Sequence, residues 1–119
     1  MATITALFVP ADATAEPELR ELERSTTLDA LQAAVGGYVE VVHLPGVKAD
    51  MFINEEGKLC GKACNVRATT LAGMLYSGLG LGDYIAGDAV ITGAPDEDGD
   101  ATGLDPLQVH ELTGALQQI

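Results

Sequence analysis

The most strand-like residues of the chain lie in the stretch 38–54, in the segments YVEVVHL (38–44) and ADMFIN (49–54). Successive side chains of a strand point to opposite faces, so that Tyr38, Glu40 and Val42 would face one way and Val39, Val41 and His43 the other. Residues 38–44 therefore predict one strand, and residues 49–54 predict a second. Pro45-Gly46 between them is a typical turn pair. We expect an antiparallel hairpin here, and we expect it at the centre of a sheet.

Further segments complete an α+β pattern in a single domain that spans residues 1–119. Residues 4–9 predict a strand at or next to the centre of the sheet, and residues 18–24 predict a strand that pairs with it as a hairpin. We expect an antiparallel sheet of about five strands with two to three helices packed on one face. The remaining predicted elements are helices at 26–35, 66–76 and 105–117 and a strand at 85–92, which a bulge or tight turn at Gly87-Asp88 interrupts.

Capping residues mark the predicted helix boundaries. Thr26 followed by Asp29 has the spacing of a capping box at the start of the first helix. Gly36-Gly37 is typical of a left-handed C-cap at its end. Asn65 and Asp105 are candidate N-caps of the other two helices. The second helix allows two alternative buried stripes, which are Val66, Thr70 and Met74 or Leu71 and Leu75.

Composition limits the class of protein. Hydrophobic residues make up 47% of the chain, aromatic residues only 4%, and Trp is absent, so the core must consist of aliphatic side chains. No apolar run is long enough to cross a membrane, and the N-terminus lacks the features of a signal peptide. Two cysteines do not make a disulfide framework. We expect a soluble protein of the cytoplasm.

The charge balance is the strongest compositional feature, because 18 acidic residues against 6 basic ones give a net charge of −12. Phosphate binding needs a basic surface, which argues against nucleic acids and anionic membranes as direct partners. A protein partner with a basic surface fits this charge. So does a role for this chain as a decoy, in which it occupies a protein that normally binds nucleic acid. Solubility in a salty or crowded host is the alternative explanation and needs no partner.

Basic residues gather in the middle of this acidic chain, at Lys48, Lys58, Lys62 and Arg67. Together with backbone amides at the start of the second helix, they could hold a small anion. Alternatively, they pair with nearby carboxylates, and the polar residues around them make ordinary turns and caps, with a positive φ at Gly57. The candidate ligand-binding residues are Asn54, Glu55, Lys58, Lys62, Asn65, Arg67 and Thr69.

The acidic loop near residue 98 resembles a calcium-binding loop only in part. Asp96, Asp98 and Asp100 alternate as in an EF-hand. Ala101 and Leu107 stand where an EF-hand has its turn glycine and its closing glutamate. A solvated loop is therefore the better interpretation.

Zinc, phosphate-loop and catalytic patterns find little support. Cys60 and Cys64 could join His43 and His110 around zinc, but their spacing does not require it. The glycine-rich segment 78–82 follows a helix and precedes a strand, which is the reverse of the order in a phosphate-binding loop. No Ser–His–Asp or Cys–His pairing follows from order or spacing. We expect no metal and no cofactor, and a function without catalysis.

Several motifs follow one another in a fixed order: Gly36-Gly37-Tyr38, the run NEEGK at 54–58, Asn65 with Ala68-Thr69, and Gly87-Asp88 with Gly93. Over about residues 26–104, this ordered set resembles a small uncharacterised family, a domain of unknown function found in bacteriophages and bacterial mobile elements. The resemblance brings no known activity, and it implies a phage or prophage accessory protein in the host cytoplasm.

Two hypotheses on function follow. The first is a small acidic protein that binds a host protein with a basic surface, in counter-defence or host modulation. The alternative is a protein that binds or sequesters a small anion, such as a nucleotide, at residues 54–70. A free edge strand would also allow a homodimer.

Overall fold

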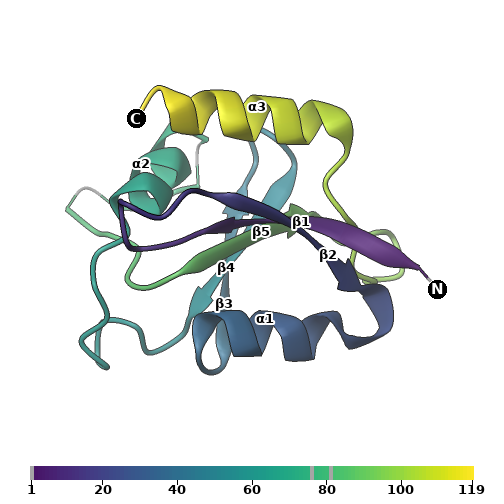
Figure 1. Ribbon diagram of the computed structural model, residues 1–119, viewed down its shortest axis with the longest axis horizontal. Coiled ribbons are helices and arrows are strands. Elements are labelled where there is room, and N and C mark those ends of the chain that lie inside the picture. The colour runs from purple at the N-terminus through teal and green to yellow at the C-terminus, as the bar shows by residue number, and fades with distance from the viewer. Residues whose placement is uncertain (1, 76, 81) are drawn as a thin grey trace.

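The computed structural model describes residues 2–75, 77–80 and 82–119, and these form one five-stranded sheet with three α-helices (Figure 1). Across the sheet the order is β2-β1-β5-β4-β3, and each pair of neighbours is antiparallel. The predicted α+β fold class is confirmed. The elements are β1 (Thr3–Val9), β2 (Glu18–Glu23), a 3₁₀ turn (Arg24–Thr26), α1 (Thr27–Val35), β3 (Val39–Leu44), β4 (Ala49–Asn54), α2 (Val66–Met74), β5 (Ala89–Gly93) and α3 (Pro106–Gln117).

Helices cover both faces of the sheet, so the expectation of helices on one face was wrong. Figure 1 shows α1 on one side of the sheet and α2 and α3 on the other. The cause lies in the strands, because β1 is apolar at consecutive positions. Phe8 packs in the core cluster of α1, whereas Leu7 and Val9 pack in the cluster of α2 and α3. A strand that is apolar on both sides needs cover on both sides.

The hairpin of β3 and β4 is not central, which corrects a second expectation. The central strand is β5, and β3 forms one edge. All five residues of β5 are buried, whereas Glu40 and His43 of β3 are exposed. Charged side chains are costly to bury without partners, so the strand that carries them takes the edge. The strand β1 lies next to the centre, and β2 pairs with it as predicted.

The first helix begins one residue later than predicted and without the predicted capping box. The side chain of Thr26 makes no capping hydrogen bond. Instead, the hydroxyl of Thr27 donates to the carbonyl oxygens of Glu23 and Arg24, because the short 3₁₀ turn brings them within reach. At the other end, Gly36 adopts the predicted left-handed conformation, with φ +79°.

The second and third helices have the predicted N-caps. The side chain of Asn65 accepts from the amide of Ala68, and Asp105 forms a capping box with Gln108. In α2 the stripe that contains Leu71 is buried, whereas Val66 is exposed. The predicted end of this helix at Tyr76 lies outside the described residues. In the part of the chain that the structure describes, no helix has the length and apolarity needed to span a membrane.

The segment just before β5 requires glycine at two positions, Gly87 and Gly57. Gly87 has φ +88°, so the predicted strand 85–92 is broken there and β5 begins only at Ala89. Gly57 was expected to have a positive φ but does not. Its role is steric, because a β-carbon at this position would lie 2.7 Å from the carbonyl oxygen of Ala86. The turn after β4 therefore packs backbone to backbone against the segment before β5.

This contact makes a testable prediction about Gly57→Ala. The added methyl group would collide with a backbone atom, so we expect a loss of about 2 kcal/mol in the free energy of unfolding. Gly73→Ala is the matched control, because it lies inside α2 with nothing within 4 Å of the added carbon, and it should stabilise by about 0.5–1 kcal/mol. Urea denaturation measures both. Equal effects of the two substitutions on stability would contradict the steric role of Gly57.

Candidate functional site

Asn65 lies at the junction of three elements and is fully buried. Its side-chain amide group donates to the carbonyl oxygens of Val9 (2.8 Å) and Gly87 (3.0 Å), and its side-chain oxygen accepts from the amide of Ala68 (3.0 Å). Its own backbone amide donates to the carbonyl of Ile85 (2.8 Å). Every polar atom of this side chain is thus used inside the protein, joining the end of β1, the approach to β5 and the start of α2.

Arg67 and Thr69, two more of the predicted ligand-binding residues, also make internal contacts. The guanidinium group of Arg67 donates to the carbonyl oxygens of Pro10 (2.8 Å) and Asp12 (3.0 Å), which fastens the β1–β2 loop to α2. The hydroxyl of Thr69 accepts from the amide of Ile85 (2.8 Å). These contacts are the ordinary cap and turn chemistry that the sequence left open as the alternative.

Asn54 and Lys62 hold the end of α1. The amide group of Asn54 donates to the carbonyl of Val35 (3.1 Å), and its oxygen accepts from the amide of Glu56 (2.7 Å). The alkyl chain of Lys62 lies over Gly87, and its ammonium nitrogen is 3.4 Å from the position that a β-carbon at Gly36 would take. A cation at the C-terminal end of a helix is favoured by the helix dipole.

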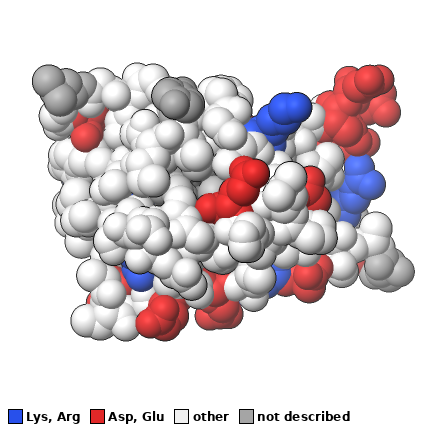
Figure 2. Space-filling view, turned by 90° about the horizontal axis from the view of Figure 1, so that it is seen from above, with Lys and Arg blue, Asp and Glu red and all other residues white. Residues whose placement is uncertain are grey.

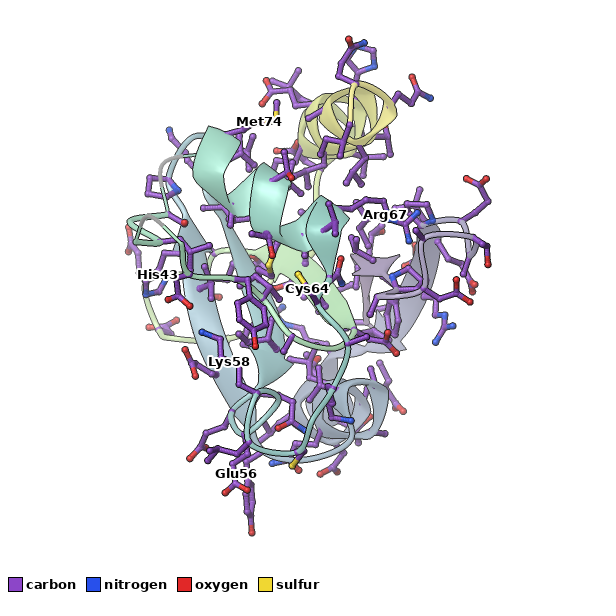
Figure 3. All side chains as sticks on the ribbon, turned by 90° about the vertical axis from the view of Figure 1, so that its left-hand side faces the viewer. His43, Glu56, Lys58, Cys64, Arg67 and Met74 are labelled. Atoms are coloured by element: carbon purple, nitrogen blue, oxygen red, sulfur yellow. The ribbon has the colours of Figure 1, made fainter. Side chains whose placement is uncertain are left out.

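The predicted basic cluster is not gathered in one place. Figure 3 shows Lys58 and Arg67 on opposite sides of the molecule, with the start of α2 near Arg67 and the β3–β4 hairpin near Lys58. A single small anion could not contact both. The prediction of an anion site at residues 54–70 stays untested, but the arrangement does not favour it.

A cleft of about 300 Å³ lies between the β3–β4 hairpin on one side and Leu79 and residues 83–86 on the other. Its apolar side chains come from both walls and include Val42, Ile53 and Ile85. Three of the predicted residues, Asn54, Glu55 and Lys58, line it. The charged residues of the lining are Glu40, Glu55, Glu56, Lys58 and Asp83.

Lys58 and Asp83 form an ion pair across this cleft, and the ammonium group lies 4.6 Å from the ring centre of Tyr84. The hydrogen bond between Lys58 and Asp83 raises the pKa of the lysine and lowers the pKa of the aspartate. Both side chains are nearly half exposed, so this pair joins Asp83 to the turn after β4 and adds little stability.

Apart from the Lys58–Asp83 ion pair, the charged side chains that line the cleft are all acidic. Glu40, Glu55 and Glu56 form no ion pair among the described residues. Three carboxylates around an apolar floor make a place for a cation with an alkyl stem, such as a lysine or arginine side chain. Figure 3 shows Glu56 at the tip of the turn below Lys58. Sequence reasoning had singled out Glu55 and Lys58 but not Glu40 or Asp83.

A second unpredicted feature is a histidine–aspartate pair on the β3–β4 hairpin. The register places His43 opposite Asp50, and the Nδ1–Oδ1 distance is 2.7 Å. The carboxylate is buried, with 5% of its side chain exposed, whereas the imidazole is 74% exposed. The histidine thus gives the buried carboxylate a partner. The hairpin pattern could have revealed this pair, because a tight antiparallel register fixes which residues face each other.

The acidic loop forms a compact turn. One carboxylate oxygen from each of Asp96, Asp98 and Asp100 lies within 4.8 Å of the other two. The side chain of Asp96 accepts from the amides of Asp98 and Asp100 and also pairs with Arg24 (3.2 Å). These contacts account for the turn without a metal ion. Cys60 and Cys64 are free thiols on the surface.

If Asn65 has this structural role, Asn65→Asp and Thr70→Ala should change the free energy of unfolding by very different amounts. Asn65→Asp keeps an acceptor for the amide of Ala68 but has no N–H group for the carbonyls of Val9 and Gly87. Because two buried carbonyls would then face a carboxylate, we expect a loss of about 3 kcal/mol in the free energy of unfolding. Thr70→Ala, at an exposed position of the same helix, should change it by less than about 0.5 kcal/mol. Urea denaturation compares the two, and an unchanged stability of Asn65→Asp would contradict the structural role.

Comparison with known proteins confirms a domain of unknown function, whereas the phage and mobile-element setting stays a prediction. A family model described as a domain of unknown function, DUF3846, matches residues 4–117. No curated protein and no solved structure matches the chain significantly. Since the match spans both helical layers and all five strands, the chain belongs to the DUF3846 family.

Proposed function

We propose that this protein is a non-catalytic binding module for a protein with a basic surface segment. The observation that carries the proposal is the acidic cleft beside β3, where Glu40, Glu55 and Glu56 surround an apolar floor. The net charge of −12 acts in the same direction, because it attracts a basic partner from a distance and speeds its association.

Acidic groups are also found on other parts of the surface. Figure 2 shows the face over α3, on which most side chains are uncharged and acidic groups lie near the middle as well as along the edges. Acidity that served solubility alone would need no particular place. Carboxylates around a cleft with apolar walls, in contrast, form the polar rim and apolar centre that protein interfaces commonly have.

The proposal includes the biological setting that the motifs imply. A phage or prophage accessory protein that acts in the host cytoplasm, in counter-defence or host modulation, would work by contact with a host protein. The chain fits such a role by its small size and its acidic surface.

The proposal predicts a steep dependence of binding on salt. A fluorescent lysine-rich peptide should bind at low ionic strength, and its affinity should fall by roughly tenfold or more between about 50 and 300 mM salt, because screening weakens exposed charge pairs. The triple variant Glu40→Gln, Glu55→Gln and Glu56→Gln should bind at least about tenfold more weakly at low salt. Fluorescence anisotropy measures both effects.

The matched control changes the same number of charges elsewhere. Asp29→Asn, Glu97→Gln and Asp98→Asn alter exposed acids outside the cleft and should weaken binding by much less. Equal losses in the two triple variants would show that net charge, not the cleft, governs binding. Salt-insensitive binding would overturn the proposal. Thermal stabilisation by a nucleotide that Lys58→Ala and Arg67→Ala abolish would favour the anion hypothesis instead.

A further inference from the structure

The outer edge of β3 is an open template for strand pairing. In the described part of the chain, no segment pairs with β3 on the side away from β4. The amide of Glu55 donates to the carbonyl of Tyr38 directly opposite it (2.9 Å). In an antiparallel ladder, hydrogen-bonded and non-bonded pairs alternate. The backbone N–H and C=O groups of Val39, Val41 and His43 therefore point away from the sheet.

The opposite edge of the sheet is protected, whereas the β3 edge is not. Charged side chains on the β2 edge discourage pairing with another strand, because an approaching chain would have to desolvate them. The strand β3 instead carries Val39, Val41 and Val42 and only one formal charge, at Glu40. The charged residues of β2 are Glu18, Arg20, Glu21 and Glu23.

The acidic cleft adjoins this open edge on the α2 face of the sheet. Glu40 and Val42 of β3 line the cleft, whereas Val41 points to the opposite face, where it is 40% exposed. A strand added at the edge would place alternate side chains on these two faces. A side chain opposite Glu40 would have its β-carbon about 5 Å from that of Glu40.

We propose that β3 captures an extended basic segment of the partner as a sixth strand, with lysine or arginine side chains in the acidic cleft and apolar side chains beside Val39 and Val41. This inference rests on the proposed function, since it specifies how the basic segment binds. The segment would alternate basic and apolar residues. A second copy of the same chain is disfavoured as the occupant, because each copy carries a net charge of −12.

The test separates strand pairing from simple charge attraction. The probe is a synthetic peptide of about seven residues in which lysine alternates with valine. The variant Val41→Pro removes an outward N–H group, and proline is tolerated on an edge strand when its nitrogen faces solvent. Its matched control, Val41→Thr, keeps the N–H group and the β-branched shape. We expect Val41→Pro to weaken binding at least about tenfold and Val41→Thr to change it less than about twofold.

A backbone-methylated form of the peptide gives the same answer without a change in the protein. Methyl groups on alternate amides block hydrogen bonds along one edge, so this peptide should bind at least about tenfold more weakly to the wild-type chain. Thermal melting will show whether Val41→Pro folds. If it does not fold, the methylated peptide alone tests strand pairing.

The outcomes distinguish the two proposals. If Val41→Pro and the methylated peptide bind as well as their controls while the cleft triple variant loses binding, strand pairing is wrong and the binding function stands. If no lysine–valine peptide binds, both proposals fail. If sedimentation shows a wild-type dimer that Val41→Pro converts to a monomer, a second copy occupies the edge and the inference is overturned.

Discussion

The hydrogen bonds of the buried Asn65 side chain hold three parts of the fold together. They join the carbonyl ends of β1 and of the segment before β5 to the first turn of α2. The backbone amide of the same residue fixes Ile85, which lines the acidic cleft. One residue thus connects the position of a helix, the start of the central strand and one wall of the candidate site. Buried polar groups of this kind specify a single arrangement, because every alternative leaves them unpaired.

The packing of helices on the two faces of the sheet explains why the candidate site lies at β3. The central strands are apolar on both faces, so α1 packs on one face and α2 and α3 on the other. At the β3 edge the cleft lies between the β3–β4 hairpin on one side and Leu79 and residues 83–86 on the other. The polar residues of β3 can remain at this edge because it is exposed to solvent. The same exposure leaves backbone groups available to a partner.

Local features of the fold could be predicted from the sequence, whereas the sheet order could not. The hairpin at 38–54, the cap at Asn65 and the left-handed Gly36 depend on residues close together in the chain, and their patterns are specific. The place of β5 at the centre depends on which strand is most completely apolar compared with all the others. That comparison requires the packed structure, so the hairpin was placed at the centre in error.

The candidate site was predicted only in part, for two physical reasons. The sequence does not show whether an Asn, Arg or Thr at the start of a helix binds a ligand or the protein's own backbone. Asn65 and Arg67 bind the backbone, which only the tertiary structure reveals. Glu40 and Asp83 are far apart in the chain, but both line the cleft that the tertiary structure forms between the hairpin and residues 83–86. The edge position of β3 also depends on sheet order.

Amide hydrogen exchange followed by NMR can show, residue by residue, whether a basic segment pairs with the outer edge of β3. In the free protein, the outward amides of Val39, Val41 and His43 should exchange rapidly, because no partner protects them. With the alternating lysine–valine peptide bound, exchange at these three amides should slow by about tenfold or more. Unchanged exchange there, or protection at β2 instead, would contradict the claim.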